Sequence, residues 1–346
     1  MKVDKEKWEK GVLSDCITTV KVKEAVQKRD YRESGKYPII SQEKDFISGY
    51  CDSEENLNSI GEVVIFGDHT RVVKFVDFDF CVGADGVKVL RPNERISPKY
   101  LFYFLKWADI PNNGYSRHFK YLKELTISYP NLPLQHSIAR ELDSVQAMID
   151  GYRQQIADLD TLAQSIFLDT FGDPVSNPKG WETNSFGNLF SLKSGDGLSA
   201  KNFEEGEYPV YGGNGITGYH SSFNKNGEFI IIGRVGAYCG NVRLVRGRFW
   251  LTDNAFELKQ TNIKFESRFL TMLLDMLNLG NKAKAMAQPV ISNVSLKHVS
   301  VILPPLPLQL HFSAQIESIE KQKEQLRRQQ ADAETLMAER MQYYFS

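Results

Sequence analysis

The stretch that decides the fold is residues 132–167, LPLQHSIARELDSVQAMIDGYRQQIADLDTLAQSIF. Its apolar residues recur at alternating intervals of four and three, the heptad spacing of helices that pack along a narrow seam. These seam residues are Ile138, Leu142, Val145, Ile149, Tyr152, Ile156, Leu159, Ala163 and Ile166. Pro133 suits a first helical turn and Gly172 suits an end. We therefore expect one helix over residues 133–172, about 55 Å long.

The same stretch begins again later, because the LPLQ of residues 132–135 returns at 306–309, a shift of 174. Other pairs keep the same order with shifts between 166 and 174. They are Trp8-Glu9 with Trp181-Glu182, Tyr37-Pro38-Ile39 with Tyr208-Pro209-Val210, residues 47–50 with 216–219, and residues 61–67 with 227–233. Chance matches would not stay collinear, so the chain contains two copies of one unit of about 173 residues.

The second copy predicts a second helix over residues 306–346. Its apolar seam contains Phe312, Ile316, Ile319, Leu326, Ala333 and Met337. Lys323, Gln330 and Arg340 occupy seam positions as polar residues. Two helices of equal length can bury their seams on each other, and polar seam residues then help to fix the register. The alternative, that each helix packs only on its own globular region, is disfavoured because the stripe is narrow.

The regions before the helices, residues 1–132 and 173–305, carry short apolar runs separated by Gly, Asp and Asn. The runs at 63–66, 72–76 and 229–232 are typical of strands and turns. Short helices are expected at 98–107 and 266–279. The fold class is therefore α+β, with domains at 1–132 and 173–305 and long helices at 133–172 and 306–346.

The composition excludes several classes of protein. Lys and Arg total 42 and Asp and Glu total 43, a net charge of −1, which argues against a strongly basic nucleic-acid coat. No apolar run approaches the roughly 20 residues of a membrane span, and the N-terminus lacks the apolar core of a signal peptide. The four cysteines form no CxxC pair, so no metal site is expected. We expect a soluble cytoplasmic protein.

Candidate catalytic motifs are weak. Residues 213–218 match GxGxxG, but the residues after them do not start a helix, as a dinucleotide site requires. Asp253 and Glu257 are only four residues apart on one apparent strand edge, which is unlike a nuclease carboxylate cluster. The sequence has no HExxH, GxSxG or P-loop, and no Asn-Pro-Pro-aromatic methyltransferase motif. We therefore expect no catalytic residues.

Polar, aromatic and basic residues gather instead in glycine-rich loops of both copies. Such side chains contact base edges and phosphates, and glycines allow the backbone to approach a duplex closely. The candidate DNA-binding residues are His69, Arg71, Lys74, Arg117, His118, Lys120, Asn214, Tyr219, His220, Arg234, Tyr238 and Asn241. The alternative is that these loops are only turns between strands. Because the copies agree in strands and helices but differ in loops, they suit two modules that hold different ligands.

Taken together, these features resemble the DNA-specificity subunit of type I restriction-modification systems. The resemblance covers essentially the whole chain. It rests on the order of two globular domains and two long helices, and on four stretches. They are YPVYGGNGI at 208–216, IGRVGAY at 232–238, LPPLPLQ at 303–309 and ISYPNLPLQ at 127–135.

The resemblance implies a non-catalytic protein that binds double-stranded DNA. Each globular domain would read one half of a bipartite, asymmetric target, the domains being related by a pseudo-twofold axis. The long helices would pair as an antiparallel coiled coil and set the gap between the half-sites. Two modification subunits, which bind S-adenosylmethionine, would dock on the helices, and a restriction subunit that uses ATP and Mg²⁺ could join them. The chain itself would bind none of these cofactors and no membrane.

Two other functions stay open at this point. A single-chain DNA-acting enzyme, such as a nuclease or a methyltransferase, would need a carboxylate cluster or a cofactor loop. A helical scaffold would bind partner helices while its loops contact no DNA. Specific binding to a cognate duplex distinguishes the scaffold from the DNA reader.

Overall fold

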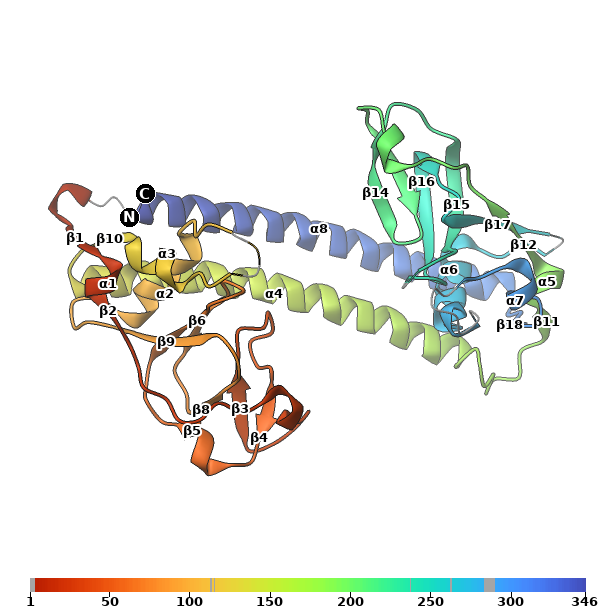
Figure 1. The fold of residues 1–346 in the computed structure, drawn as a ribbon. Coiled ribbons are helices and arrows are strands. Elements are labelled where there is room, and N and C mark those ends of the chain that lie inside the picture. Colours follow the sequence, from red (N-terminus) through yellow and green to blue (C-terminus); the bar gives the residue numbers. More distant parts are fainter. Residues whose placement is uncertain (1–3, 113, 115, 237, 262, 283–289) are drawn as a thin grey trace. The chain divides into compact units, whose positions relative to one another are not determined.

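The computed structural model in Figure 1 describes residues 4–112, 114, 116–236, 238–261, 263–282 and 290–346. The chain divides into two compact units. Unit 1 contains Met1–Gln154 and Arg327–Ser346, and unit 2 contains Gln155–Leu326. Two helices of 40 residues, α4 (Leu132–Phe171) and α8 (Leu306–Phe345), contribute one part to each unit. These bounds lie close to those expected from the heptad spacing.

The strands of unit 1 are short and form three groups. Four strands pair in the order β2-β9-β6-β7, four in the order β4-β3-β8-β5, and β1 pairs with β10. Their bounds are β1 Glu9–Val12, β2 Ile17–Thr19, β3 Tyr37–Ile40, β4 Gly49–Cys51, β5 Leu57–Asn58, β6 Val63–Gly67, β7 Val73–Val76, β8 Phe80–Val82, β9 Val87–Pro92 and β10 Thr126–Tyr129. The helices of unit 1 are α1 Leu13–Cys16, α2 Pro98–Trp107 and α3 Phe119–Glu124, with 3₁₀ turns η1 Lys5–Lys7, η2 Lys28–Asp30 and η3 Glu54–Asn56.

The core of unit 1 lies between its sheet, α2 and the long helices. All five residues of β6 are buried, because Val64 and Phe66 pack in one core cluster and Val63 and Ile65 in another on the opposite face. Helix α2 begins at Pro98, which suits the first turn because its missing N–H has no partner there. The α2 residues Tyr100 and Phe104 pack in one cluster with Ile138 and Leu142 of α4.

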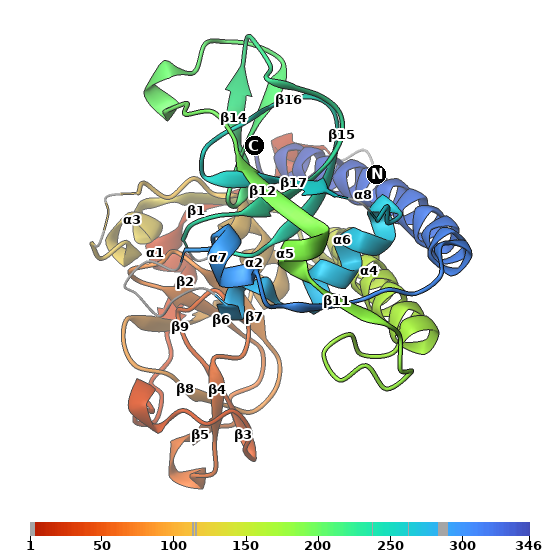
Figure 2. The same cartoon turned by 90° about the vertical axis from the view of Figure 1, so that its right-hand side faces the viewer.

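Unit 2 repeats this plan with longer strands. A six-stranded sheet has the order β12-β17-β15-β16-β13-β14, and β11 pairs with β18. The bounds are β11 Thr183–Ser185, β12 Phe190–Ser194, β13 Tyr208–Gly212, β14 Gly215–His220, β15 Lys225–Gly233, β16 Val242–Leu251, β17 Ala255–Gln260 and β18 Ser300–Ile302. The helices are α5 Phe186–Leu189, α6 Ser267–Met276 and α7 Asn293–Leu296, with η4 Ala200–Asn202 and η5 Leu279–Lys282. Helix α6 packs against β16. In Figure 2, the strands β14, β15 and β16 lie above α5 and α6.

In unit 1 the two long helices pack on each other and run antiparallel. The carboxylate of Glu141 accepts a hydrogen bond from Tyr344 Oη at 2.7 Å and lies 3.2 Å from Arg340 Nε. Farther along α4, Arg153 Nη2 lies 2.8 Å from Glu334 Oε1. The seam residues Ile138, Leu142, Val145 and Ile149 share one buried cluster with Ala333, Met337, Met341 and Tyr344.

In unit 2 the remaining parts of these helices also pack together. The aromatic rings of Phe167 and Phe171 lie 5.6 and 5.4 Å from the ring of Phe312. Phe171 also lies 4.6 Å from Phe269 of α6. The expected seam residue Ile166 is only half-buried, because here the buried stripe of α4 turns towards α6 and passes through Phe167 instead.

The seam residues between the buried cluster of unit 1 and that of unit 2 are less buried. Tyr152, Ile156, Leu159 and Leu326 are half-buried, whereas Ile316 and Ile319 lie in the core of unit 2. Among the polar seam residues, Lys323 is buried and Gln330 and Arg340 are half-buried. Each helix therefore packs both on its own globular region and on the other helix. The α+β class is confirmed.

The repeated LPLQ motif has the same structural role in both units. The buried side chain of Gln135 accepts a hydrogen bond from Ser97 N at 2.8 Å and donates to Arg95 O and Pro130 O. Gln309 accepts from Glu266 N at 3.0 Å and donates to Pro304 O. Ser97 and Glu266 are the N-cap residues of α2 and α6. Each glutamine thus fastens the start of a long helix to the start of a globular-domain helix.

Candidate nucleic-acid interface

In unit 1, the loop after β6 is fastened to the segment before α3. Asp68 is buried, and its backbone oxygen accepts a hydrogen bond from His118 N at 2.8 Å. Its Oδ1 atom accepts another from Phe119 N at 2.8 Å. A carboxylate that bonds backbone N–H groups makes strong, directional contacts. The two loops that sequence reasoning chose in this copy therefore lie together.

Cationic side chains surround α3, and all but Lys88 among those named here are exposed. Arg117 and Lys120 are exposed, as expected for phosphate contacts. The Nζ atoms of Lys88 and Lys123 lie 5.7 and 5.5 Å from the ring of Phe119. Sequence reasoning missed these two lysines. The helical spacing of Phe119 and Lys123 could have indicated one of them, whereas only the fold brings Lys88 to α3 from β9.

Lys74 is a correction to the sequence-based prediction. Its ammonium group is buried and donates to Ser41 O at 2.9 Å, to Phe46 O at 3.3 Å and to Asp45 O. Burial lowers the pKa of Lys74. The side chain therefore organises the loop between β3 and β4 and has no free donor to aim at a phosphate.

The two predicted histidines His118 and His220 are also corrections, because both are buried. The Nδ1 atom of His118 lies 2.9 Å from Asp68 O. The Nδ1 atom of His220 accepts a hydrogen bond from Glu204 N at 3.0 Å. A buried ring whose nitrogen is occupied by the protein backbone cannot also reach a base edge, so both histidines support loops.

His69 and Arg71 keep part of their polar surface. The backbone N–H of His69 donates to Gln42 Oε1 at 3.1 Å, and its Nδ1 lies 3.3 Å from Ser116 O. Arg71 has a positive φ of 61° and donates from Nη1 to Ile110 O at 2.8 Å. Both side chains are half-buried. They sit at the loop surface but are held in place by the protein.

In unit 2, the hairpin of β13 and β14 presents Asn214 and Tyr219, and both are exposed. Arg234 is more restrained, because its guanidinium lies 5.4 Å from the ring of Phe256 and donates to Asp253 O at 3.3 Å. Tyr238 is exposed, whereas the backbone of Asn241 pairs with Gly233 and Tyr238. The two segments lie against each other, because a Cβ atom on Gly213 would be 3.1 Å from Val235 O and one on Gly233 would be 2.6 Å from Gly213 O.

Three arginines of β16 were missed by the sequence reasoning. Arg243, Arg246 and Arg248 are exposed. Arg243 Nη2 lies 3.5 Å from Asn214 O, and the Arg248 guanidinium lies 5.2 Å from the ring of Phe223. Arg246 is paired with Glu228 at 2.7 Å. In the β16 sequence VRLVRGRFWL, arginines recur between apolar residues and glycine. This pattern could have identified the three arginines from the sequence.

The carboxylates near β17 do not make a nuclease-like cluster. Glu257 lies on β17 and its Oε2 is 2.5 Å from Lys225 Nζ, so its charge is compensated. Asp253 precedes the strand and contributes its backbone oxygen to Arg234. Within the described residues, no group of His, Cys, Asp and Glu could hold a metal ion. Over the same residues, no helix combines the length and apolarity needed to cross a bilayer.

The model of one protein family matches the chain twice. The family is described as the type I restriction modification DNA specificity domain, and the matches cover residues 5–160 and 178–333. Together they span most of the chain. The chain belongs to this family. The internal duplication deduced from the collinear sequence pairs is therefore a tandem pair of specificity domains.

The chain is also similar to two curated proteins over more than a third of its length. The chain is 32% identical over 136 residues to the type I restriction enzyme EcoprrI specificity subunit of Escherichia coli, which covers 38% of the chain and 33% of that protein. It is 27% identical over 137 residues to the EcoR124I/EcoR124II specificity subunit of Escherichia coli, which covers 36% of the chain and 34% of that protein. The matches thus span about a third of these relatives.

A solved structure shares the fold of this specificity-domain pair along its whole length. It is the S subunit of a type I restriction-modification system from M. genitalium, with a TM-score of 0.65 and 19% sequence identity. The similarity covers 100% of this chain and 98% of that one. At this identity the match supports the fold alone.

Proposed function

We propose that this chain is the non-catalytic DNA-specificity subunit of a type I restriction-modification complex. In this proposal each specificity domain reads one half of a bipartite, asymmetric DNA target. The observation that carries the proposal is one family domain present twice, with a shared strand frame and different loops. A shared frame explains a common mode of binding, and different loops explain two different half-sites.

The exposed side chains support nucleic acid as the ligand. Unit 1 offers Arg117, Lys120 and Lys123 around α3, and unit 2 offers Arg243 and Arg248 on β16. Lysine and arginine contact phosphates and arginine also contacts guanine edges. The overall charge of −1 predicts modest DNA binding by the chain alone, since phosphate contacts dominate affinity.

The long helices are the proposed spacers, at 133–172 and 306–346, with the globular domains at 1–132 and 173–305. They would set the gap between half-sites and dock two modification subunits, and a restriction subunit could join. S-adenosylmethionine, ATP and Mg²⁺ are assigned in this proposal to those partner subunits. Nothing in the recognition step itself requires a cofactor on this chain.

The test is the methylation pattern of cells that express the chain together with a modification subunit of the same kind of system. A two-part motif with a fixed gap, lost when this gene is deleted, supports the proposal. A contiguous palindrome assigned to the gene, or an unchanged pattern after deletion, contradicts it. Purified chain that methylates or cuts DNA alone would instead support an enzyme.

A second experiment tests the spacer role. One heptad is inserted near residues 157–160 of α4 and one at the facing position near 323–326 of α8. A heptad preserves the seam, so pairing should persist while the helices lengthen by about 10 Å. The preferred gap should change and both half-sites should remain. Altered half-sites with an unaltered gap contradict the spacer role.

A further inference from the structure

Each unit contains a hairpin, and the two hairpins share a register at their proline and at the residue that follows it. In unit 1, β3 pairs with β4 so that Pro38 faces Tyr50 and Ile39 faces Gly49. In unit 2, β13 pairs with β14 so that Pro209 faces Tyr219 and Val210 faces Gly218. In both hairpins, the first strand also pairs in parallel with another strand of the same unit. These pairs are β3 with β8 and β13 with β16. Gly49 and Tyr50 are therefore structurally equivalent to Gly218 and Tyr219. In unit 2 the register then shifts at a bulge between Val210 and Tyr211. Ile47 and Ile216 each lie two residues before the equivalent glycine.

Each hairpin exposes an isoleucine at the equivalent position. Ile47 is 36% exposed and Ile216 is 51% exposed. Tyr219, three residues after Ile216, is 55% exposed, and its equivalent Tyr50 is half-buried. A single exposed apolar residue is ordinary on a protein surface. Here both copies expose an isoleucine that neither core needs, which indicates a binding role.

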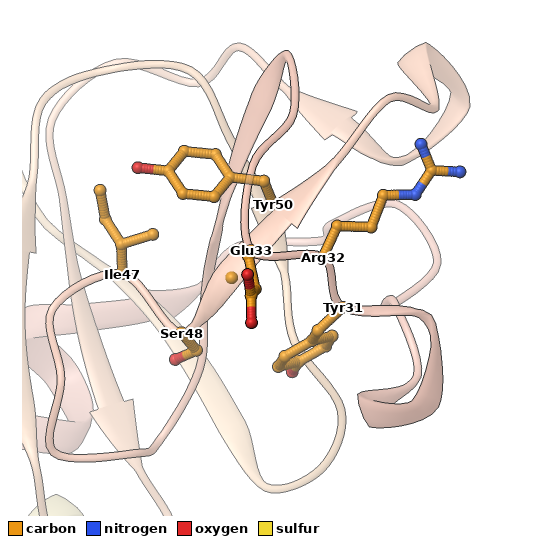
Figure 3. Close-up of a pocket in the computed structure, with 7 residues that line it drawn as sticks. Tyr31, Arg32, Glu33, Ile47, Ser48 and Tyr50 are labelled. Carbon is orange, nitrogen blue, oxygen red and sulfur yellow. The ribbon is translucent and has the colours of Figure 1, made fainter. Parts of the chain in front are cut away.

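In unit 1 this isoleucine lines an open hollow of about 460 Å³. Figure 3 shows Ile47 and Tyr50 on one side of the hollow, with Glu33 between them and Tyr31, while Arg32 extends away. Arg32 is paired with Asp52. The Glu33 carboxylate repels phosphate, so the hollow suits a base edge better than the DNA backbone.

The segments between the paired strands differ, although the frame is shared. In unit 1, six residues separate Ile40 from Ile47, and buried Lys74 holds this loop through three of its carbonyl oxygens. In unit 2, four residues separate Tyr211 from Ile216. There, a Cβ atom on Gly215 would lie 3.3 Å from Arg243 Cζ, so this glycine leaves room for the guanidinium. The constant isoleucine is thus flanked by different polar chemistry in each unit.

We propose that Ile47 and Ile216 are equivalent apolar contacts to base edges in duplex DNA, one in each half-site. The inference rests on the proposed function, because it places the reading element of each domain on the β3–β4 and β13–β14 hairpins. The C5 methyl group of thymine is the apolar feature of the major-groove edge, and it is the group that each isoleucine contacts. The flanking loops then select the neighbouring bases. Each half-site must accordingly contain an A·T pair.

The test measures binding of the full chain, alone and assembled with the modification subunit used for the methylation mapping. The probes are a duplex with the bipartite motif found by methylation mapping, duplexes in which deoxyuridine replaces thymine in one half-site, and a scrambled duplex. Removing a buried methyl group should weaken wild-type binding about fourfold. Ile47→Ala and Ile216→Ala should each weaken binding to the motif about tenfold. Each variant should then be insensitive to deoxyuridine in its own half-site and remain sensitive in the other.

Control variants separate this contact from a general loss of apolar surface. Val12→Ala and Val294→Ala truncate exposed valines of units 1 and 2 and should bind like wild type. Ile47→Val should retain the sensitivity to deoxyuridine. Variants that bind the motif normally, or that lose binding equally on the scrambled duplex, overturn the inference. Wild-type chain that does not prefer the motif over the scrambled duplex refutes the proposed function itself.

Discussion

The ammonium group of Lys323 on α8 lies 2.6 Å from Oδ1 of Asp160 on α4, within unit 2. Its side chain is buried, and a second carboxylate, Glu320, lies 2.7 Å away. Burial alone would lower the pKa of Lys323, but the hydrogen bonds to the two carboxylates outweigh it and raise the pKa. A polar residue in an apolar seam is thus compensated by a contact that joins the two helices.

Removing the carboxylates should leave the ammonium group uncompensated. We predict that Asp160→Asn with Glu320→Gln destabilises the pairing of α4 and α8 by about 2 kcal/mol. This free energy is smaller than that expected for a fully buried ion pair, because both carboxylates are about half exposed. Hydrogen exchange of the α8 amides around Lys323 reports the change. The control is Asp169→Asn, which changes an exposed carboxylate on α4 and should leave the exchange rates unaltered. Equal protection of these amides in wild type, the double variant and the control contradicts the prediction.

The buried side chain of Gln135 also supports a prediction about stability. Replacing it by Leu leaves Ser97 N–H, Arg95 O and Pro130 O without their partner in a buried site. Unpaired buried polar groups cost about 1–3 kcal/mol each, so Gln135→Leu should destabilise unit 1 by at least about 2 kcal/mol. Urea unfolding measures this loss of stability. The control is Gln155→Leu at an exposed position of α4. If Gln135→Leu loses no more unfolding free energy than this control, the motif does not fasten α2.

The arginines of β16 should affect the affinity for all DNA sequences alike. Arg243→Gln and Arg248→Gln each remove one exposed cation, so each should reduce the slope of log affinity against log salt by about one. Arg246→Gln should have a smaller effect, because Glu228 already neutralises that guanidinium at 2.7 Å. Titrations with scrambled duplex at several salt concentrations provide the measurement. Unchanged slopes for Arg243→Gln and Arg248→Gln would place the DNA elsewhere.

Glu228 predicts a pH dependence of stability. A hydrogen bond with Ser267 and, next, the contact with Arg246 lower the pKa of Glu228 below its ordinary value. The carboxylate is therefore stabilising above its unfolded pKa of about 4.3, and this contribution is lost as the pH falls through the lower folded pKa. Wild type should exceed Glu228→Gln in urea midpoint near neutral pH, and the difference should vanish in acid. A difference that stays constant with pH would rule out this ionisation.

Sequence periodicity was sufficient for the architecture. The heptad seam predicted both long helices, and the collinear pairs, including Gln135 with Gln309, predicted the duplication. The short helices α2 and α6 were also expected close to their observed positions. These features depend on local spacing and on repeated apolar positions, which are visible without knowing what a segment touches.

Exposure and partner choice were decided only by the tertiary structure. Lys74, His118 and His220 have the composition of DNA contacts, but each is buried against backbone groups brought from distant segments. Ile47 and Ile216 are apolar and are nevertheless exposed. The physical reason is that spacing along the chain specifies which face of an element is apolar, whereas the burial of a loop side chain depends on which other segments fold against it.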